Sequence, residues 1–503
     1  MALRSLPILI FCALLALTAA AQQPHPCGST GGRSAWLQAF QRHELTLAAR
    51  GDSLQLNVHS RLLAEDDGSA AFPFRRYLET IGALEQQLEG TGIRVAVVGQ
   101  DTISDSAFNV HDDVLDGAAA MARYNLPAGL NMYFLNDPAG NCGYNLPYGG
   151  VTVKRDRCSG AGSTTLAHEV GHALSLPHPF IGWEGGQSYD GSVPADFDNP
   201  APPQVTYDYT YFKDTLILDT LIVDTALVEL VDGSNCAEAA DGFCDTPPDY
   251  VAQRWTCDAN GESVTQTDPN GERFQSDGSL IMSYANDACH SRFSPEQQAA
   301  MRAFARDQRS EWVADQIDTA TVDGASDALL DGVDLDEGQL VTFSAVPGAT
   351  HYYVEASSRS SFGLLAFSGV VRDTSLTVTA DAFDVGRRYF YRVYAYRNND
   401  HRAGFGRQGS FTMRAVSSIG TPFVQAVRLA PNPVPAGGAV TVELSERTRI
   451  TITAADGRRL SDHVAHRGEV TLPAPGRVGT FVAHFRGLSS GHTYARRLVV
   501  TPN

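Results

Sequence analysis

The sequence is short of positive charge and of long apolar runs. Its 38 Lys and Arg residues are outnumbered by 57 Asp and Glu residues, which gives a formal net charge of −19 at pH 7. This balance argues against a nucleic-acid backbone or an anionic membrane surface as a partner. Beyond the N-terminus, the most apolar stretch runs from Thr215 to Val231, and Asp219, Asp224 and Glu229 interrupt it. We therefore expect no transmembrane segment.

Residues 1–21 have the pattern of a secretory signal peptide. Arg4 gives the positive start, Leu6 to Leu17 the apolar stretch, and Ala19 to Ala21 the small-residue cleavage site. An exported protein meets oxidising conditions, in which cysteines pair. The sequence thus predicts a secreted or cell-surface protein with disulfide bonds.

Cysteine is absent after residue 289, although the chain continues to residue 503. Cys12 lies in the signal peptide, so seven of the eight cysteines remain in the mature chain (8 − 1 = 7). Because seven is odd, one is left over, and Cys27 is the best candidate since it sits alone near the new N-terminus. Cys142 and Cys158 bracket a Gly-rich stretch and are expected to close one loop. The others are Cys236, Cys244, Cys257 and Cys289.

The motif that carries chemistry is the run LAHEVGHALSLPHP, which contains three histidines and one glutamate. His168 and His172 are four residues apart, so on a helix both imidazoles project from one face. Glu169 can then reach a water held on a shared metal, as in the H-E-x-x-H zinc hydrolases. Pro177 ends the helical hydrogen bonding and allows His178 to become a third ligand. Three histidines and one open position are typical of catalytic zinc.

A second sequence element argues against the possibility that the histidine motif matches the zinc hydrolases by accident. The run Ile281-Met282-Ser283-Tyr284 follows about a hundred residues later. In the metzincin class of zinc proteases, a tight turn places a methionine beneath the three histidines, and a tyrosine two residues later can hydrogen-bond the oxyanion of the reaction. Met282 and Tyr284 have that spacing.

Hydrophobic periodicity predicts an α/β arrangement around this motif. The zinc helix should begin near Ser163 or Thr164. A strand within Gly143 to Arg157 would form the edge along which an extended substrate pairs. The expected strands are Leu54–Leu63, Ile93–Val98 and Leu130–Leu135, and the expected helices are Ala35–Ala49, Phe74–Leu88, Val114–Tyr124 and Phe293–Arg309.

The long insertion at residues 180–235 contains a five-residue repeat in which Asp214, Asp219 and Asp224 each precede Thr. Five fits neither helix nor strand periodicity, and we expect a small hairpin. The acidic stretch that follows, with Asp241 and Asp245, could bind calcium, although Asp residues that cap turns are the commoner explanation.

After a linker near residues 316–334, the pattern becomes all-β. Leu340 to Met413 alternates short strands with turns and resembles a fibronectin type III-like sandwich, assigned to residues 335–415, with a role in spacing or adhesion. The segment 425–503, which begins with LAPNP and alternating strands, resembles the C-terminal sorting domain of the type IX secretion system. The alternative is another small β-sandwich.

Residues from about 50 to 315 resemble the pappalysin/cytophagalysin family of metzincin metalloproteases. The matching stretches are AHEVGHALSLPHPF, DGFCDTPPD and SLIMSYANDACHSRFSPEQ. The resemblance implies an α/β metzincin-like catalytic domain (twisted sheet plus zinc helix) over residues 51–315, followed by two all-β sandwich-like domains. It implies His168, His172 and His178 as zinc ligands, Glu169 as catalytic base, Met282 in the Met-turn and Tyr284 as the accessory tyrosine.

The resemblance also implies calcium near the cleft, and a pro-segment (residues 22–50) in which Cys27 can block the zinc. The alternative for this segment is a frayed N-terminus with an incidental thiol. Two interleaved disulfides are typical of the family, which implies Cys236–Cys257 and Cys244–Cys289. One departure is Ser175, since metzincins usually carry Gly at this bend; a non-Gly residue in a left-handed conformation costs about 1–2 kcal/mol.

The sequence therefore predicts a secreted zinc endopeptidase that cleaves protein or peptide substrates with a zinc-activated water and Glu169 as general base. A rival prediction is a non-enzymatic surface-binding protein that uses the zinc domain as a scaffold. A zinc hydrolase that acts on something other than peptides is a third. The complete His-Glu-His-His set argues against the second prediction, and the Met-turn argues against the third.

Overall fold

The computed structural model describes residues 27–29, 32–47, 51–147, 149–186, 193–212, 219–414, 429–444, 446–454, 458–488 and 493–502. The predicted signal peptide, residues 1–21, lies outside these ranges. The chain divides into two compact units, Met1–Arg414 and Ala415–Asn503, which are described one at a time.

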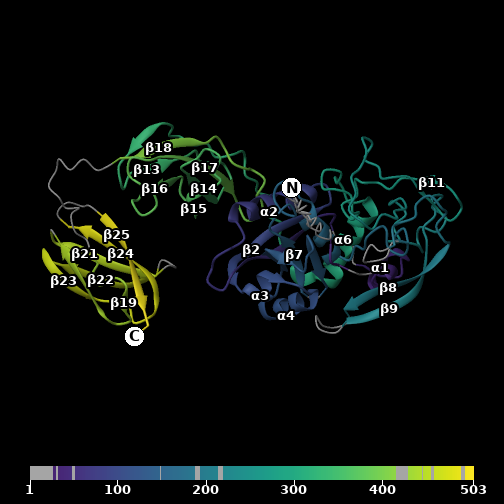
Figure 1. The fold of residues 1–503 in the computed structure, drawn as a ribbon, viewed down its shortest axis with the longest axis horizontal. Coiled ribbons are helices and arrows are strands. Elements are labelled where there is room, and N and C mark those ends of the chain that lie inside the picture. Colours follow the sequence, from purple (N-terminus) through teal and green to yellow (C-terminus); the bar gives the residue numbers. More distant parts are fainter. Residues whose placement is uncertain are drawn as a thin grey trace, which may run out of the picture. The chain divides into compact units, whose positions relative to one another are not determined.

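A five-stranded mixed sheet with the order β2-β1-β4-β7-β6 lies at the centre of the first part of the chain (Figure 1). Neighbours are parallel except for β6, which is antiparallel to β7 and lies at the edge. Parallel neighbours need crossover connections. Helix α2 joins β1 to β2 and α4 precedes β4, whereas β4 reaches β7 by way of β6. These predicted elements are confirmed, although β2 continues past its expected end at Val98: β1 (Leu54–Ala64), α2 (Phe74–Gln87), β2 (Ile93–Ser104), α4 (Val114–Tyr124), β4 (Leu130–Leu135), β6 (Gly143–Leu146) and β7 (Gly150–Lys154).

Shorter elements complete this part. The predicted N-terminal helix ends early, as α1 (Ala35–Gln41). The predicted closing helix is α6 (Pro295–Gln308), which starts with a capping box between Ser294 and Gln297. The predicted hairpin in the insertion is β8 (Gln204–Phe212) with β9 (Asp219–Leu227). The others are α3 (Ser106–Asn109), β3 (Val110–His111), β5 (Asp137–Pro138), α5 (Thr165–Ala173), β10 (Gln266–Thr267), β11 (Arg273–Phe274) and η1 (Ser310–Trp312).

The disulfides confirm one prediction and correct another. Cys142–Cys158 closes the loop that holds β6 and β7, as expected. The interleaved pairs Cys236–Cys257 and Cys244–Cys289 are wrong, because the structure pairs Cys236 with Cys244 and Cys257 with Cys289. A tight loop brings the first two Cα atoms to 5.1 Å. The other pair lies at 6.1 Å, because the chain at Trp255 pairs with the chain at Ala285.

The segment after residue 330 forms a two-sheet sandwich with its own core. One sheet has the order β12-β18-β17-β14-β15 and the other pairs β13 with β16. This agrees with the predicted sandwich. Its strands are β12 (Val333–Leu335), β13 (Leu340–Thr342), β14 (His351–Ser357), β15 (Leu365–Val371), β16 (Ser375–Thr377), β17 (Arg388–Tyr396) and β18 (Gly409–Met413).

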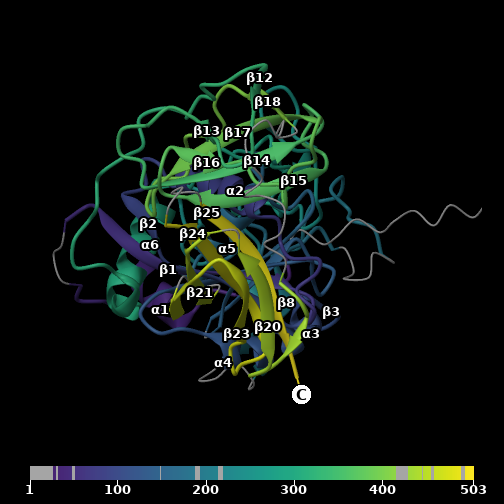
Figure 2. The same ribbon diagram turned by 90° about the vertical axis from the view of Figure 1, so that its left-hand side faces the viewer.

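This sandwich packs directly on helix α2 (Figures 1 and 2). The backbone N–H and Nδ1 of His401 contact the two carboxylate oxygens of Glu85 at 2.6 and 2.8 Å, and both side chains are buried. The rings of Phe74 and Tyr353 lie 5.2 Å apart. Tyr353, Tyr394 and Tyr396 belong to the same hydrophobic core as the central sheet. The sandwich is therefore part of the first compact unit rather than an independent one.

Gly82 of α2 tests this contact, because a Cβ there would lie 2.5 Å from the carbonyl oxygen of His401. In a free helix, Gly82→Ala would stabilise by roughly 0.5–1 kcal/mol. Against the sandwich, we expect it to lower the free energy of unfolding by about 1–3 kcal/mol. Denaturant unfolding measures this, with the exposed Gln86→Ala on the same helix as control. A more stable Gly82→Ala protein would contradict the packing.

The second unit is a smaller sandwich. Its sheets have the orders β19-β25-β24-β21-β22 and β20-β23, around a core that includes Val442, Ile450 and Phe485. Its strands are β19 (Val434–Pro435), β20 (Ala439–Leu444), β21 (Thr448–Ala454), β22 (Arg459–Ala465), β23 (Gly468–Pro473), β24 (Gly479–Gly487) and β25 (Thr493–Thr501).

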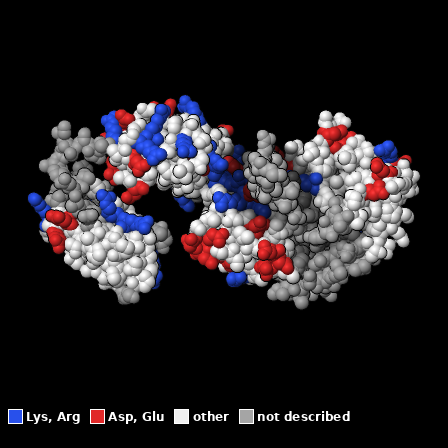
Figure 3. Space-filling view, in the orientation of Figure 1, with Lys and Arg blue, Asp and Glu red and all other residues white. Residues whose placement is uncertain are grey.

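The surface of the described residues carries the acidic side chains that the composition predicts. Figure 3 shows acidic side chains gathered on the surface near α3 and α4. The acidic residues within or next to these two helices are Asp105, Asp112, Asp113 and Asp116. No helix within the described ranges is both long enough and apolar enough to cross a bilayer.

Candidate metal centre

Helix α5 and the bend after it bring three histidines together. Thr164 is the N-cap, and the helix ends at Ala173. Ser175 then takes a left-handed conformation, with φ of 75°, and the N–H of Leu176 returns to the carbonyl of Gly171 at 3.0 Å. This is the bend expected at Ser175, and it turns the chain back toward the helix. The Nε2 atoms of His168, His172 and His178 consequently lie 3.1 Å from one another.

Hydrogen bonds on the far side of two rings fix which nitrogen faces the cluster. Nδ1 of His168 lies 2.7 Å from the carbonyl of Ile281, and Nδ1 of His172 lies 2.7 Å from the carbonyl of Leu176. A carbonyl only accepts, so each Nδ1 carries the proton and each Nε2 presents a lone pair. Burial lowers the pKa of His168 to about 4, which keeps this ring neutral at pH 7.

Lone pairs that face one another at this distance repel unless a cation lies between them. Four ligands arranged tetrahedrally about zinc, at about 2.0–2.1 Å, place their nitrogens about 3.3 Å apart. The observed 3.1 Å between Nε2 atoms is close to that value. The three histidines therefore fit a tetrahedral divalent cation such as zinc.

Met282 and Tyr284, which the sequence assigned to a Met-turn, both lie next to α5 and the histidine cluster. Met282 is fully buried beneath α5, and a Cβ at Gly171 would collide with its sulfur, so the glycine permits this packing. The Tyr284 ring lies 4.8 Å from the ring of His178 and 6.0 Å from that of His168. The Tyr284 hydroxyl donates to the carbonyl of Cys27 at 3.3 Å, and the Cys27 sulfur lies close to the three histidines.

Glu169 is completely buried beside the histidines and faces the edge strand β6. A Cβ at Gly143 of β6 would lie 3.0 Å from the Glu169 side chain. Oε1 of Glu169 has no hydrogen-bond partner among the residues that the structure describes. Burial raises the pKa of this carboxyl to about 8. A cation on the neighbouring histidines would oppose that shift, because positive charge favours the carboxylate.

Cys27 completes a four-residue cluster. Its Sγ and the ligand nitrogens of His168, His172 and His178 all lie within 4.8 Å of one another. Cys27 lies outside the three disulfides, as the odd count predicted, and it is 2% exposed. The backbone N–H of Ser29 donates to its sulfur at 3.2 Å. One thiolate and three imidazoles form a complete tetrahedral donor set.

Three contacts of the Cys27 segment could not be found in the sequence. The N–H of Gly28 donates to the carbonyl of Gly143 at 2.8 Å, so the segment pairs with the edge strand. The hydroxyl of Ser29 donates to Glu169 at 3.3 Å and accepts from the N–H of Asn145 at 2.7 Å. Ser29 and Asn145 are 116 residues apart, and no short motif links them.

Helix α1 anchors this segment to the body of the protein. Leu37 is fully buried in the main core, and Trp36 stacks on Phe40 with ring centroids 5.3 Å apart. Arg33 donates to the carbonyls of Ala237 and Glu238. The described part of the predicted pro-segment is thus docked, and a frayed N-terminus does not describe it.

The calcium prediction named Asp241 and Asp245. Both carboxylate oxygens of Asp245 accept hydrogen bonds from the start of α6, whereas Asp241 lies in a buried acidic group. Glu229, Asp241 and Asp249 are all less than 5% exposed. Burial, with some repulsion from the two Asp residues, raises the pKa of Glu229 to about 10. Oδ2 of Asp241 and Oδ2 of Asp249 have no hydrogen-bond partner in the described ranges, and such oxygens suit calcium. Oδ1 of Asp241 also caps a turn by accepting from Phe243 N–H at 3.1 Å. Calcium binding stays a prediction.

Comparison with known proteins assigns no family. No protein-family model and no curated protein matches the chain. Among solved structures, PorZ, a surface component of the type IX secretion system of Porphyromonas gingivalis, is 19% identical over 22% of this chain and 15% of its own, with a TM-score of 0.15.

Two further solved structures give similar values. The BSP domain of a biofilm-associated protein is 15% identical over 37% of this chain and 31% of its own, with a TM-score of 0.14. Domains FN1–FN3 of chicken CNTN1 are 10% identical over 36% and 67%, with a TM-score of 0.15. The chain spans less than a third of the first two. At such TM-scores, none of these similarities carries an argument about function.

Proposed function

We propose that this protein is an exported zinc endopeptidase of the pappalysin/cytophagalysin type, held latent by its own N-terminal segment. The observation that carries the proposal is the convergence of three Nε2 atoms at 3.1 Å, with the buried carboxylate of Glu169 beside them. His168, His172 and His178 would hold the zinc. When bound, zinc supplies a Lewis acid that polarises a carbonyl and lowers the pKa of water toward about 7.

The chain's own residues have defined parts in this proposal. Glu169 takes a proton from the attacking water and passes it to the leaving nitrogen. Tyr284, whose hydroxyl already reaches the cluster region, donates to the oxyanion; such a contact contributes about 3 kcal/mol in other enzymes. Strand β6 holds an extended peptide by backbone pairing, in the way that Gly143 accepts from Gly28.

Latency follows from the position of the Cys27 segment. The thiolate of Cys27 would fill the fourth ligand position, and the Ser29 hydroxyl engages Glu169 at 3.3 Å. Residues 27–29, called the Cys27 strip below, also occupy the edge of β6 with which a substrate would pair. The three consecutive residues Cys27, Gly28 and Ser29 therefore block the fourth ligand position, the edge of β6 and the catalytic base Glu169, respectively.

Export is supported by the signal-peptide pattern and by three disulfides, which form in oxidising compartments. We assign the second unit to sorting by the type IX secretion machinery because of its LAPNP start and β-sandwich form. The rival function, a non-enzymatic binding protein, would need the metal cluster only as a scaffold. It gives no reason for a buried Glu169 beside the ligands.

Metal analysis together with a protease assay tests the proposal. We expect the full chain with Cys27→Ala to contain one zinc and to cleave casein, and chelation to abolish cleavage and lower the melting temperature. His172→Ala should weaken zinc binding by more than about 100-fold, beyond the loss typical of outer-shell changes. His466→Ala, an exposed histidine of the second unit, is the matched control. A His172→Ala protein with full zinc content would contradict the ligand assignment.

A further inference from the structure

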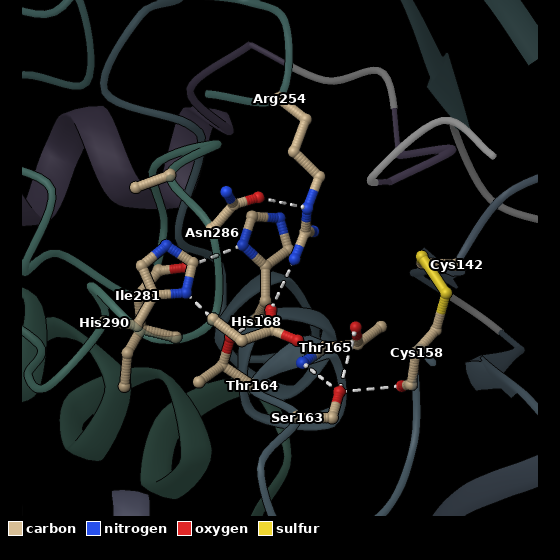
Figure 4. Close-up of polar contacts among 12 residues, drawn as sticks. Cys142, Cys158, Ser163, Thr164, Thr165, His168, Arg254, Ile281, Asn286 and His290 are labelled. Carbon is tan, nitrogen blue, oxygen red and sulfur yellow. Dashed lines mark hydrogen bonds and ion pairs between the residues drawn. A yellow bond between two sulfur atoms is a disulfide. The ribbon is translucent and has the colours of Figure 1, made fainter. Parts of the chain in front are cut away.

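The first turn of α5 is hydrogen-bonded to the segment that follows Met282 and Tyr284 (Figure 4). Thr164 is the N-cap of the helix, but its side chain makes no capping hydrogen bond. The Thr164 hydroxyl instead lies 2.7 Å from Nδ1 of His290 and donates to Oδ1 of Asp287 at 3.0 Å. A hydroxyl has a single hydrogen, so Nδ1 of His290 is the donor and Thr164 accepts from it.

The second nitrogen of His290 faces the turn beneath the histidines. Its Nε2 lies 3.4 Å from the hydroxyl of Ser283, which stands between Met282 and Tyr284. The N–H of Ser283 donates to the carbonyl of Leu280 at 3.0 Å and closes that turn. His290 therefore contacts both the start of α5 and the turn.

The same two stretches of chain meet again at His168, one helical turn after Thr164. The N–H of His168 donates to the carbonyl of Thr164 at 3.0 Å, and its Nδ1 donates to the carbonyl of Ile281 at 2.7 Å. The space that Thr164, His168, Tyr284 and His290 enclose with their neighbours is only about 10 Å³. This volume is at the lower limit for one water. The side chains thus pack directly on one another, and a shift of Thr164 would move His168.

The segment that carries His290 is firmly anchored. The preceding residue, Cys289, is joined to Cys257 by a disulfide. Arg254 fixes Asp287, because its Nη2 donates to Oδ1 at 2.8 Å and its side chain is only 27% exposed. Loss of the His290 ring would therefore release the start of α5 and leave the anchor in place.

We propose that His290 is a positioning residue: acting through Thr164, it fixes the start of α5 and with it the ring of His168. His290 is not among the four clustered side chains that could hold a metal, so its effect is indirect. This inference rests on the proposed function, because it concerns the ligand set that the function uses.

Replacement of His290 in the full chain with Cys27→Ala tests it. His290→Phe keeps a ring but cannot donate to Thr164. We expect it to lower kcat and the zinc affinity by about tenfold each, the lower end for outer-shell changes, and to leave KM unchanged because no substrate contact is lost. The visible absorption bands of the cobalt-loaded protein should also shift, since they report how the ligands are arranged. His290→Asn, whose amide N–H can replace that of Nδ1, should restore most of the values of the parent.

Two comparisons separate positioning from a general loss of stability. Thr164→Val removes the hydroxyl and should reproduce the effects of His290→Phe, whereas Thr164→Ser should keep the values of the parent. His59→Phe is the matched control, because Nε2 of this half-buried histidine of β1 lies 3.0 Å from the carbonyl of Pro127. We expect it to lower the melting temperature and to leave the cobalt spectrum and kcat unchanged.

The outcomes distinguish this inference from the proposed function. An unchanged cobalt spectrum and kcat in folded His290→Phe would overturn the role of His290, whatever its melting temperature. A parent that binds cobalt but cleaves no peptide would overturn the proposed function, and the spectra would still decide the role of His290. A parent that binds no metal would overturn both. If His290→Phe fails to fold, the spectra of Thr164→Val and Thr164→Ser decide in its place.

Discussion

Replacing Glu169 by alanine is expected to reduce peptide cleavage by at least about a thousandfold and to leave the zinc content unchanged. The carboxylate is fully buried next to the histidines but is not one of the four clustered ligands. Its loss removes the proton acceptor without removing a metal donor. Initial rates on casein, with zinc measured on the same preparation and Cys27→Ala as the parent, give both quantities.

A near-isosteric control sharpens this test. Glu169→Gln keeps the volume of a side chain that packs near Gly143, so a loss of activity there cannot come from a cavity. Activity close to that of the parent in either variant would remove Glu169 from the role of general base. A loss of zinc in both variants would instead show that Glu169 supports the ligands.

Replacing Cys27 by alanine is expected to make the uncleaved chain active without a lag. The sulfur lies within 4.8 Å of the ligand nitrogens of the histidine cluster, and its removal opens the fourth position. We expect the remaining contacts of Gly28 and Ser29 to yield to a substrate. We expect the activity of the uncleaved chain to rise by about 10–100-fold or more, the scale of change when a supporting group of a metal site is lost. Progress curves of freshly refolded protein, with chain length followed by mass spectrometry, measure this.

The matched control is the double variant Cys27→Ala/Glu169→Ala, which should be inactive if the new activity belongs to this site. Ser29→Ala keeps the thiol but frees Glu169 and the N–H of Asn145, so it separates the contribution of the thiol from that of the strip. A lag in Cys27→Ala that equals the lag of the unaltered chain would exclude the latency role.

Local patterns predicted that the three histidines would lie together, because the determinants of this cluster lie close together in the chain. The spacing of His168 and His172 defines one helix face, and the bend at Ser175 was expected from its position. The Gly-rich stretch bracketed by Cys142 and Cys158 indicated the edge strand, which is present as β6 paired with β7. Each of these inferences needs only a few neighbouring residues.

Features that depend on distant pairing were wrong or invisible. Cysteine spacing does not say which loops come together, so the pairing of Cys257 with Cys289 depended on the contact between Trp255 and Ala285. The contact of Glu85 with His401 joins residues 316 apart. Neither residue differs in sequence from an ordinary surface residue, because what distinguishes them is the partner that folding supplies.

The contact of the first sandwich with α2 determines where a shortened version of this protein can end. A truncation before residue 316 would leave Tyr77 and the Glu85 carboxylate facing solvent without their cover. A shortened protein for crystallisation or for fusion to another enzyme should therefore end at Arg414, where the first compact unit ends. Exchange of this sandwich for that of another protein would require redesign of α2 at the same time.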